Sequence, residues 1–136
     1  MANFSNRSDC ADVVIVDGDA GYPLGSVTSQ NVTIANNTAL SAELDLGVST
    51  LVGVIIPATW TAADLTFQAS VDGTNYFNLY DDNAGEVTVK GTAGAYIVMR
   101  NLDLWRGVRF LIIRSGTHSV AVNQGGDRVL TVVQST

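Results

Sequence analysis

The chain has 136 residues, the usual size of one domain, and 46% of them are hydrophobic against 15% charged, which excludes an intrinsically disordered chain. Thirteen acidic residues against seven basic ones give a net charge of −6, which argues against the basic stripe of a nucleic-acid-binding protein. The longest apolar run, residues 51–57, is far shorter than the ~20 residues of a membrane-spanning helix. We therefore predict no nucleic-acid partner and no membrane partner.

The first twelve residues are polar and without periodicity, which predicts a flexible N-terminal arm at residues 1–12 and a single β-domain at residues 13–136. The start of the chain lacks the basic and apolar stretches of a signal peptide. Cys10 is the only cysteine, so no internal disulfide forms, and the sequence has no Cys/His spacing for zinc. We expect assembly in a reducing cytoplasm.

Short strands separated by Gly, Asn and Asp turns follow one another along the chain. Residues 12–17 form a β-branched run, and a loop rich in glycine follows at 18–25. Residues 40–46 alternate, with Leu40, Ala42, Leu44 and Leu46 on one face, which is the period of a half-buried strand. Further strands are predicted at residues 32–34, 50–56, 65–71, 76–80, 86–90, 95–100, 108–114 and 128–134.

The only helix candidate is the short segment 61–64. Regular short strands with turn signals predict an all-β fold, an antiparallel β-sandwich of the jelly-roll type with about eight to ten strands.

No catalytic constellation is evident in the sequence, and we predict no enzyme activity and no cofactor. His118, the only histidine, lies in a loop-like stretch without a neighbouring nucleophile or orienting carboxylate. Asp81 and Asp82 are adjacent within a turn, where such side chains usually bond to their own backbone. Residues 17–19 and 81–83 carry oxygen ligands suited to calcium, but turn chemistry accounts for both segments, and calcium stays an open alternative.

Four aromatic residues are candidates for a glycan-stacking platform: Trp60, Tyr76, Tyr80 and Trp105. Both tryptophans lie at strand ends, where an indole usually closes the end of a core. We favour the core interpretation and keep the glycan platform as the alternative.

Several segments of the chain carry a family resemblance. They are residues 57–76 (PATWTAADLTFQASVDGTNY), 79–81 (LYD), 108–117 (VRFLIIRSGT) and 124–133 (QGGDRVLTVV). These strand-and-turn patterns resemble small β-sandwich virion structural proteins of tailed bacteriophages, of the decoration, head-fibre or tail-associated type. The resemblance implies a protein of the virion that oligomerises and does no chemistry.

We accordingly expect a capsid decoration protein, of the cement or head-fibre type, that binds the major capsid protein or another virion protein and stabilises the shell. The expected assembly is a homo-oligomer, with a trimer favoured. A tail or baseplate component and a carbohydrate-binding module are the alternatives, the latter with a glycan as partner. The predicted interface consists of Asn3, Phe4 and Arg7 in the arm and of Arg106, Arg109 and Arg114.

Overall fold

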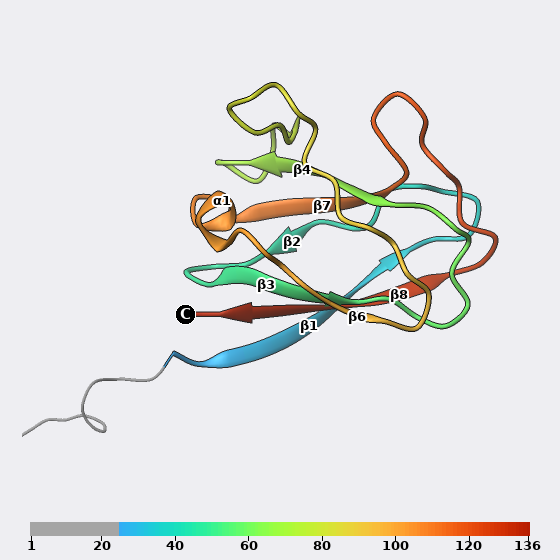
Figure 1. Ribbon diagram of the computed structural model, residues 1–136, viewed down its shortest axis with the longest axis horizontal. Helices are drawn as coiled ribbons and strands as arrows, with labels where there is room; N and C mark the ends of the chain where they lie inside the picture. Colours follow the sequence, from blue (N-terminus) through green and yellow to red (C-terminus); the bar gives the residue numbers. More distant parts are fainter. Residues whose placement is uncertain (1–24) are drawn as a thin grey trace, which may run out of the picture.

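Two antiparallel four-stranded sheets pack face to face in the computed structural model, which describes residues 25–136 (Figure 1). Strands β1, β8, β3 and β6 form sheet A, in that order, and strands β2, β7, β4 and β5 form sheet B. The strands are β1 (Val27–Ile34), β2 (Leu44–Asp45), β3 (Thr50–Ile55), β4 (Leu65–Ser70), β5 (Phe77–Asn78), β6 (Tyr96–Val98), β7 (Phe110–Ser115) and β8 (Arg128–Ser135), and one short helix, α1 (Leu102–Trp105), precedes β7.

The strand order is that of a jelly roll. β4 pairs with β5, β3 with β6, β2 with β7 and β1 with β8, like successive rungs of one long hairpin. Rolling this hairpin puts alternate rungs into opposite sheets, and the pairs β3–β8 and β4–β7 then join the rungs within each sheet. The predicted antiparallel sandwich of the jelly-roll type is therefore confirmed.

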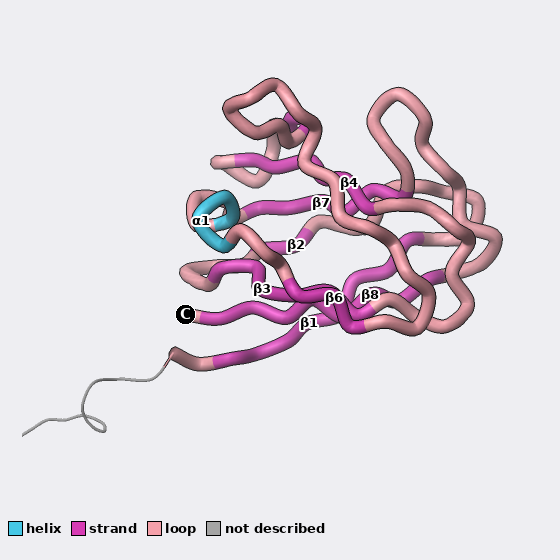
Figure 2. The backbone as a smooth tube through the Cα atoms, in the orientation of Figure 1, coloured by secondary structure: helices cyan, strands magenta, loops and turns pink. Residues whose placement is uncertain are grey.

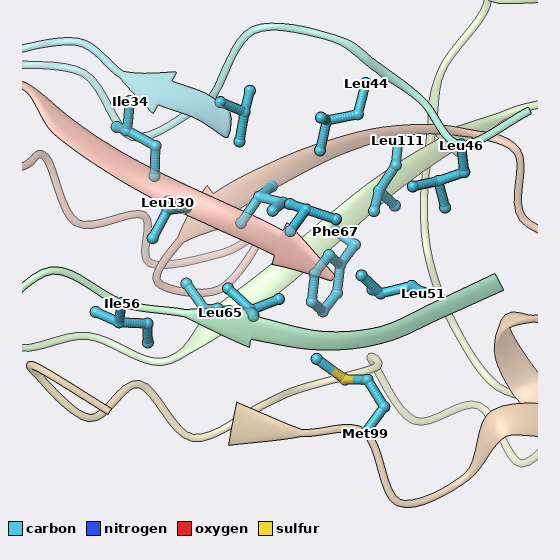
Figure 3. Close-up of a cluster of buried hydrophobic side chains, with 14 of the residues drawn as sticks. Ile34, Leu44, Leu46, Leu51, Ile56, Leu65, Phe67, Met99, Leu111 and Leu130 are labelled. Atoms are coloured by element: carbon cyan, nitrogen blue, oxygen red, sulfur yellow. The ribbon is translucent and has the colours of Figure 1, made fainter. Parts of the chain in front are cut away.

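The core lies between the sheets and is built by period-two alternation. Leu65 and Phe67 of β4 point inward beside Ile113 and Ser115 of β7, their register partners. Figure 3 shows Phe67 in the middle of the buried cluster. Each fully buried large side chain of this kind contributes about 1.5–3 kcal/mol relative to exposure.

Most predicted strands are present, with shifted ends. Residues 86–90 differ, because they contribute only isolated bridges, Leu65 with Val89 and Tyr80 with Glu86. The predicted arm and the predicted strand at residues 12–17 lie outside the described residues. Loops make up a large share of the backbone, as Figure 2 shows.

The one helix among the described residues is α1, and the short candidate segment 61–64 is not helical. Four residues are too few for a helical hydrophobic period to show in a sequence. Among the described residues, no helix is long and apolar enough to cross a membrane.

The predicted alternation over residues 40–46 is right at its end and wrong at its start. Leu44 and Leu46 are buried, but Leu40 is 43% exposed and Ser41 is buried. Here the chain passes from sheet A to sheet B, and Ser41 bridges to Ile34 while its amide donates to the carbonyl of Ile113. The Ser41 hydroxyl accepts from the amide of Ile113, so this polar side chain is satisfied inside the fold.

Candidate functional site

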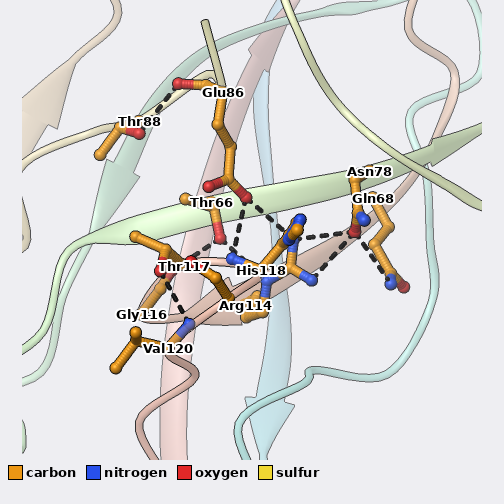
Figure 4. Close-up of polar contacts among 11 residues, drawn as sticks. Thr66, Gln68, Asn78, Glu86, Thr88, Arg114, Gly116, Thr117, His118 and Val120 are labelled. Atoms are coloured by element: carbon orange, nitrogen blue, oxygen red, sulfur yellow. Dashed lines mark hydrogen bonds and ion pairs between the residues drawn. The ribbon is translucent and has the colours of Figure 1, made fainter.

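Arg114, in the C-terminal half of β7, is itself buried and is the centre of a cluster of polar side chains (Figure 4). The residue is only 6% exposed. Its Nε donates to the hydroxyl of Thr66 at 2.9 Å, and both terminal nitrogens donate to Oδ1 of Asn78 at 3.0 Å. One of these nitrogens also lies 3.3 Å from Oε2 of Glu86. We call Thr66, Asn78, Glu86, Arg114 and His118 the Arg114 cluster.

The cluster lies on the outer face of sheet B and holds the loop that follows β7. Thr66 pairs with Arg114 in the sheet register, and its hydroxyl donates to the carbonyl of Gly116 at 2.6 Å. The amide of His118 donates to Oε2 of Glu86 at 3.0 Å. The guanidinium is thus neutralised within the chain, and its hydrogen bonds hold the loop at residues 116–121 in place.

These contacts correct the prediction that Arg114 belongs to an interface with an acidic capsid surface. Strand alternation places the side chain on the outer face of its sheet, but that position is covered by Asn78, Glu86 and the following loop. A guanidinium that is buried and already paired within the chain is not available to a partner protein.

The two other predicted arginines are exposed, and each pairs within the chain. Arg109 makes a bidentate contact with the carboxylate of Asp45, at 2.9 and 3.1 Å, and its guanidinium lies 4.7 Å from the ring centre of Phe110. The hydrogen bond from Arg109 and then the one from the amide of Gly47 lower the pKa of Asp45. Arg106 lies 3.0 Å from Asp103, with both side chains largely in solvent.

The three arginines do not form one group. Arg106 follows α1, Arg109 precedes β7, and Arg114 lies near the other end of the same strand. Five residues of extended chain separate Arg109 from Arg114, or about 16 Å. Asn3, Phe4 and Arg7, the other predicted interface residues, lie outside the described residues.

The two tryptophans are core residues, which corrects the alternative of a glycan platform containing them. The indole nitrogen of Trp60 donates to the carbonyl of Ala63 at 3.0 Å. Trp105 packs edge-on against Phe67, with ring centres 4.8 Å apart. Both indoles are buried, and the segments that carry them, α1 and the loop after β3, lie at opposite ends of the sandwich (Figure 1).

The two tyrosines of the predicted platform differ from each other. Tyr76 is half-buried, and its buried hydroxyl has no hydrogen-bond partner among the described residues. Burial first, and the nearby Glu43 carboxylate second, raise the pKa of Tyr76. Tyr80 is exposed and meets the ring of His118 edge-on, with centres 6.2 Å apart.

The turn at residues 81–85 is built by its own aspartate. The Asp81 carboxylate accepts hydrogen bonds from the amides of Asn83 and Gly85, both at 2.9 Å. Within residues 25–136, no three His, Cys, Asp or Glu side chains gather as a metal site would require. The other candidate calcium segment, residues 17–19, lies outside the described part of the chain.

An open hollow of about 640 Å³ lies beside the Arg114 cluster, where the crossing segment between the sheets meets the loop after β7. Small side chains such as Ala35, Ala39 and Ala121 line it, together with Leu40 and His118. Sequence reasoning missed this hollow, because its walls are joined only by long-range pairing, such as the amide of Ser115 donating to the carbonyl of Ala39.

Comparisons with known proteins bear on the fold. No protein-family model matches the sequence, and no curated protein matches it either. Among solved structures, the chain is similar to the crystal structure of the SPBc2 prophage-derived protein YomS, with a TM-score of 0.55 and 13% sequence identity. The match covers 87% of this chain and 100% of that one. The jelly roll described above is therefore a fold shared with a whole prophage-derived protein.

Proposed function

We propose that the chain is a structural protein of a bacteriophage virion, and specifically a capsid decoration protein of the cement or head-fibre type. The observation that carries the proposal is the match of the jelly roll to the entire length of a prophage-derived protein. The strand-and-turn patterns that resemble tailed-phage virion proteins support the same origin. Because fold alone does not specify function, the capsid role needs the experiment given below.

The arrangement of side chains supports a binding function spread over a surface. The Arg114 cluster satisfies its own charge, and both indoles serve the core. A protein of this kind stabilises a shell by bridging its subunits and needs no reacting group, so the proposal includes no catalysis. Its localisation would be the virion, assembled in the host cytoplasm.

The proposed partner is the major capsid protein or another virion protein. Arg106 and Arg109 are the described members of the predicted interface that remain exposed, and Asn3, Phe4 and Arg7 are the proposed contacts of the N-terminal segment. The trimer predicted from the sequence remains a prediction that a solution mass would test.

The test is binding to heads of the phage that encodes the chain, prepared without this protein. Purified protein and heads are sedimented together, and the bound copies are counted. Saturable binding to heads would support the proposal, and binding only to tails would move the assignment to the alternative, a tail or baseplate component. Absence of binding to either particle would overturn the virion assignment.

Two alanine variants separate the arginine contacts from unspecific attraction. Arg106→Ala removes an exposed, interface-candidate guanidinium, and Arg100→Ala removes another exposed guanidinium outside the predicted set. The proposal expects weaker binding for Arg106→Ala and unchanged binding for Arg100→Ala. Equal binding by both variants and the unchanged protein would remove Arg106 from the interface.

A further inference from the structure

The four sheet edges of the jelly roll are protected very unequally. β2 and β5 have two residues each and β6 has three, and such short edges offer little backbone to another strand. β1, the remaining edge of sheet A, has eight residues, VTSQNVTI, without a charge or a proline. Long, uncharged edge strands attract further strands, and proteins usually blunt them.

Two hydrogen bonds near the ends of β1 show which of its residues point their amides and carbonyls away from sheet A. The carbonyl of Ser26 accepts from the amide of Thr136, so even-numbered residues turn their backbone groups toward β8. The carbonyl of Thr33 accepts from the amide of Ala42, on the other side of the strand. The amides and carbonyls of Val27, Ser29 and Asn31 therefore point away from sheet A, and no other described residue pairs with them.

The outer face of sheet A continues this uncharged edge across the strands. Register pairing places Asn31, Thr131, Ile55 and Tyr96 in one row across the four strands. The next row consists of Ser29, Val133, Gly53 and Val98. Neither row contains a charge, although the chain carries 20 charged side chains. Tyr96 and Val98 remain 57% and 67% exposed.

We propose that β1 pairs antiparallel with β1 of a second copy of this chain, across a two-fold axis. The two sheets A then form one continuous sheet of eight strands, and the outward groups of Val27, Ser29 and Asn31 find partners. A two-fold contact brings each surface against itself, so it must be complementary to itself.

The net charge of the chain favours a second copy as the partner of β1. Two copies carry −6 each and repel one another over most of their surface, but an uncharged strand meets its own copy without a like-charge contact. The inference does not depend on the virion assignment, and it specifies a two-fold pair where the sequence alone favoured a trimer.

The test uses the full-length chain at a series of concentrations, with light scattering for mass and NMR amide exchange for the edge. A mass of twice 14.3 kDa is expected, with slow exchange at the amides of Ser29 and Asn31 that weakens on dilution. Monomers with fast exchange at these amides would overturn the proposal. Slow exchange independent of concentration would overturn it too, because the edge would then be covered by the same chain. A trimer would contradict the two-fold axis.

A matched pair of lysine variants tests the edge itself. Ser29→Lys places a charge on the exposed edge, and Ala93→Lys makes the same change of charge in the exposed turn before β6. Ser29→Lys should weaken the dimer about tenfold or more, since like charges on facing strands are destabilising. Ala93→Lys should leave the dimer unchanged. A dimer equally stable in both variants would place the contact elsewhere.

Discussion

Replacing Arg114 with leucine removes a guanidinium that has four hydrogen-bond contacts to three side chains. The substitution leaves Thr66, Asn78 and Glu86 without their common donor. Of these three, Thr66 is fully buried and Glu86 is largely buried. It keeps an apolar side chain of moderate size in the space, so loss of the polar contacts dominates the result. The loop at residues 116–121 loses part of its support in the same step.

The expected loss of unfolding free energy follows from the burial of the Arg114–Glu86 ion pair. The side chain of Arg114 is 7% exposed and that of Glu86 16% exposed, so little water reaches either group. Removing one partner of a buried ion pair costs about 3–5 kcal/mol, and we expect the low end, about 3 kcal/mol, because Glu86 can turn partly to solvent. For a domain of this size that corresponds to a loss of roughly 10 °C in Tm.

Urea denaturation, followed by tryptophan fluorescence, measures this cost. The matched control is Arg106→Leu, which removes an exposed guanidinium and should cost less than about 1 kcal/mol. The double variant Arg114→Leu with Glu86→Leu should recover part of the loss, since no charge is then left unpaired. Equal stabilities of Arg114→Leu and Arg106→Leu would refute the description of Arg114 as a buried, paired residue.

Three further predictions concern the core, the turns and acid stability. Trp105→Ala should cost about 3–5 kcal/mol in urea denaturation, because it empties a buried ring site, whereas Val120→Ala, at an exposed position, should cost less than about 0.5 kcal/mol. Gly116→Ala should destabilise the fold by about 1–3 kcal/mol or more, because the φ of Gly116 is +92° and a Cβ would lie 2.6 Å from the carbonyl oxygen of Val120. In the control, Gly107→Ala, the added Cβ meets no atom, so the change should be neutral or slightly stabilising. Amide hydrogen bonds within its own turn hold the pKa of Asp72 well below its usual range, so its contribution to stability is present above about pH 4 and disappears as the pH falls toward the folded-state pKa. Asp72→Asn should therefore flatten the loss of stability in an acid titration followed by circular dichroism, and an unchanged acid profile would contradict this role.

Local signals in the sequence predicted the parts of the fold that are built locally. The strand predicted at residues 65–71 is present as β4, and a turn whose amides donate to the Asp72 carboxylate follows it. The position of both indoles at strand ends indicated a core role, and the structure buries them. Such features depend on side-chain period and turn chemistry, which a single sequence carries.

Features that depend on pairing between distant segments escaped the sequence. Strand alternation places Arg114 on the outer face of sheet B. The side chain is covered there only because Glu86, 28 residues earlier in the sequence, and the loop after β7 pack over it. Ser41 is buried because the chain changes sheets there, which no local period indicates. The free edge of β1 likewise becomes visible only once β8, about a hundred residues later, is paired on its other side.

The proposed virion role is tested most directly by immunogold electron microscopy of phage particles purified from cells that produce this chain. Antibody raised against the chain should label the heads of intact virions in many copies per particle, and leave the tails unlabelled. Particles that carry no label, together with a chain found only in the unassembled fraction of the lysate, would contradict the account.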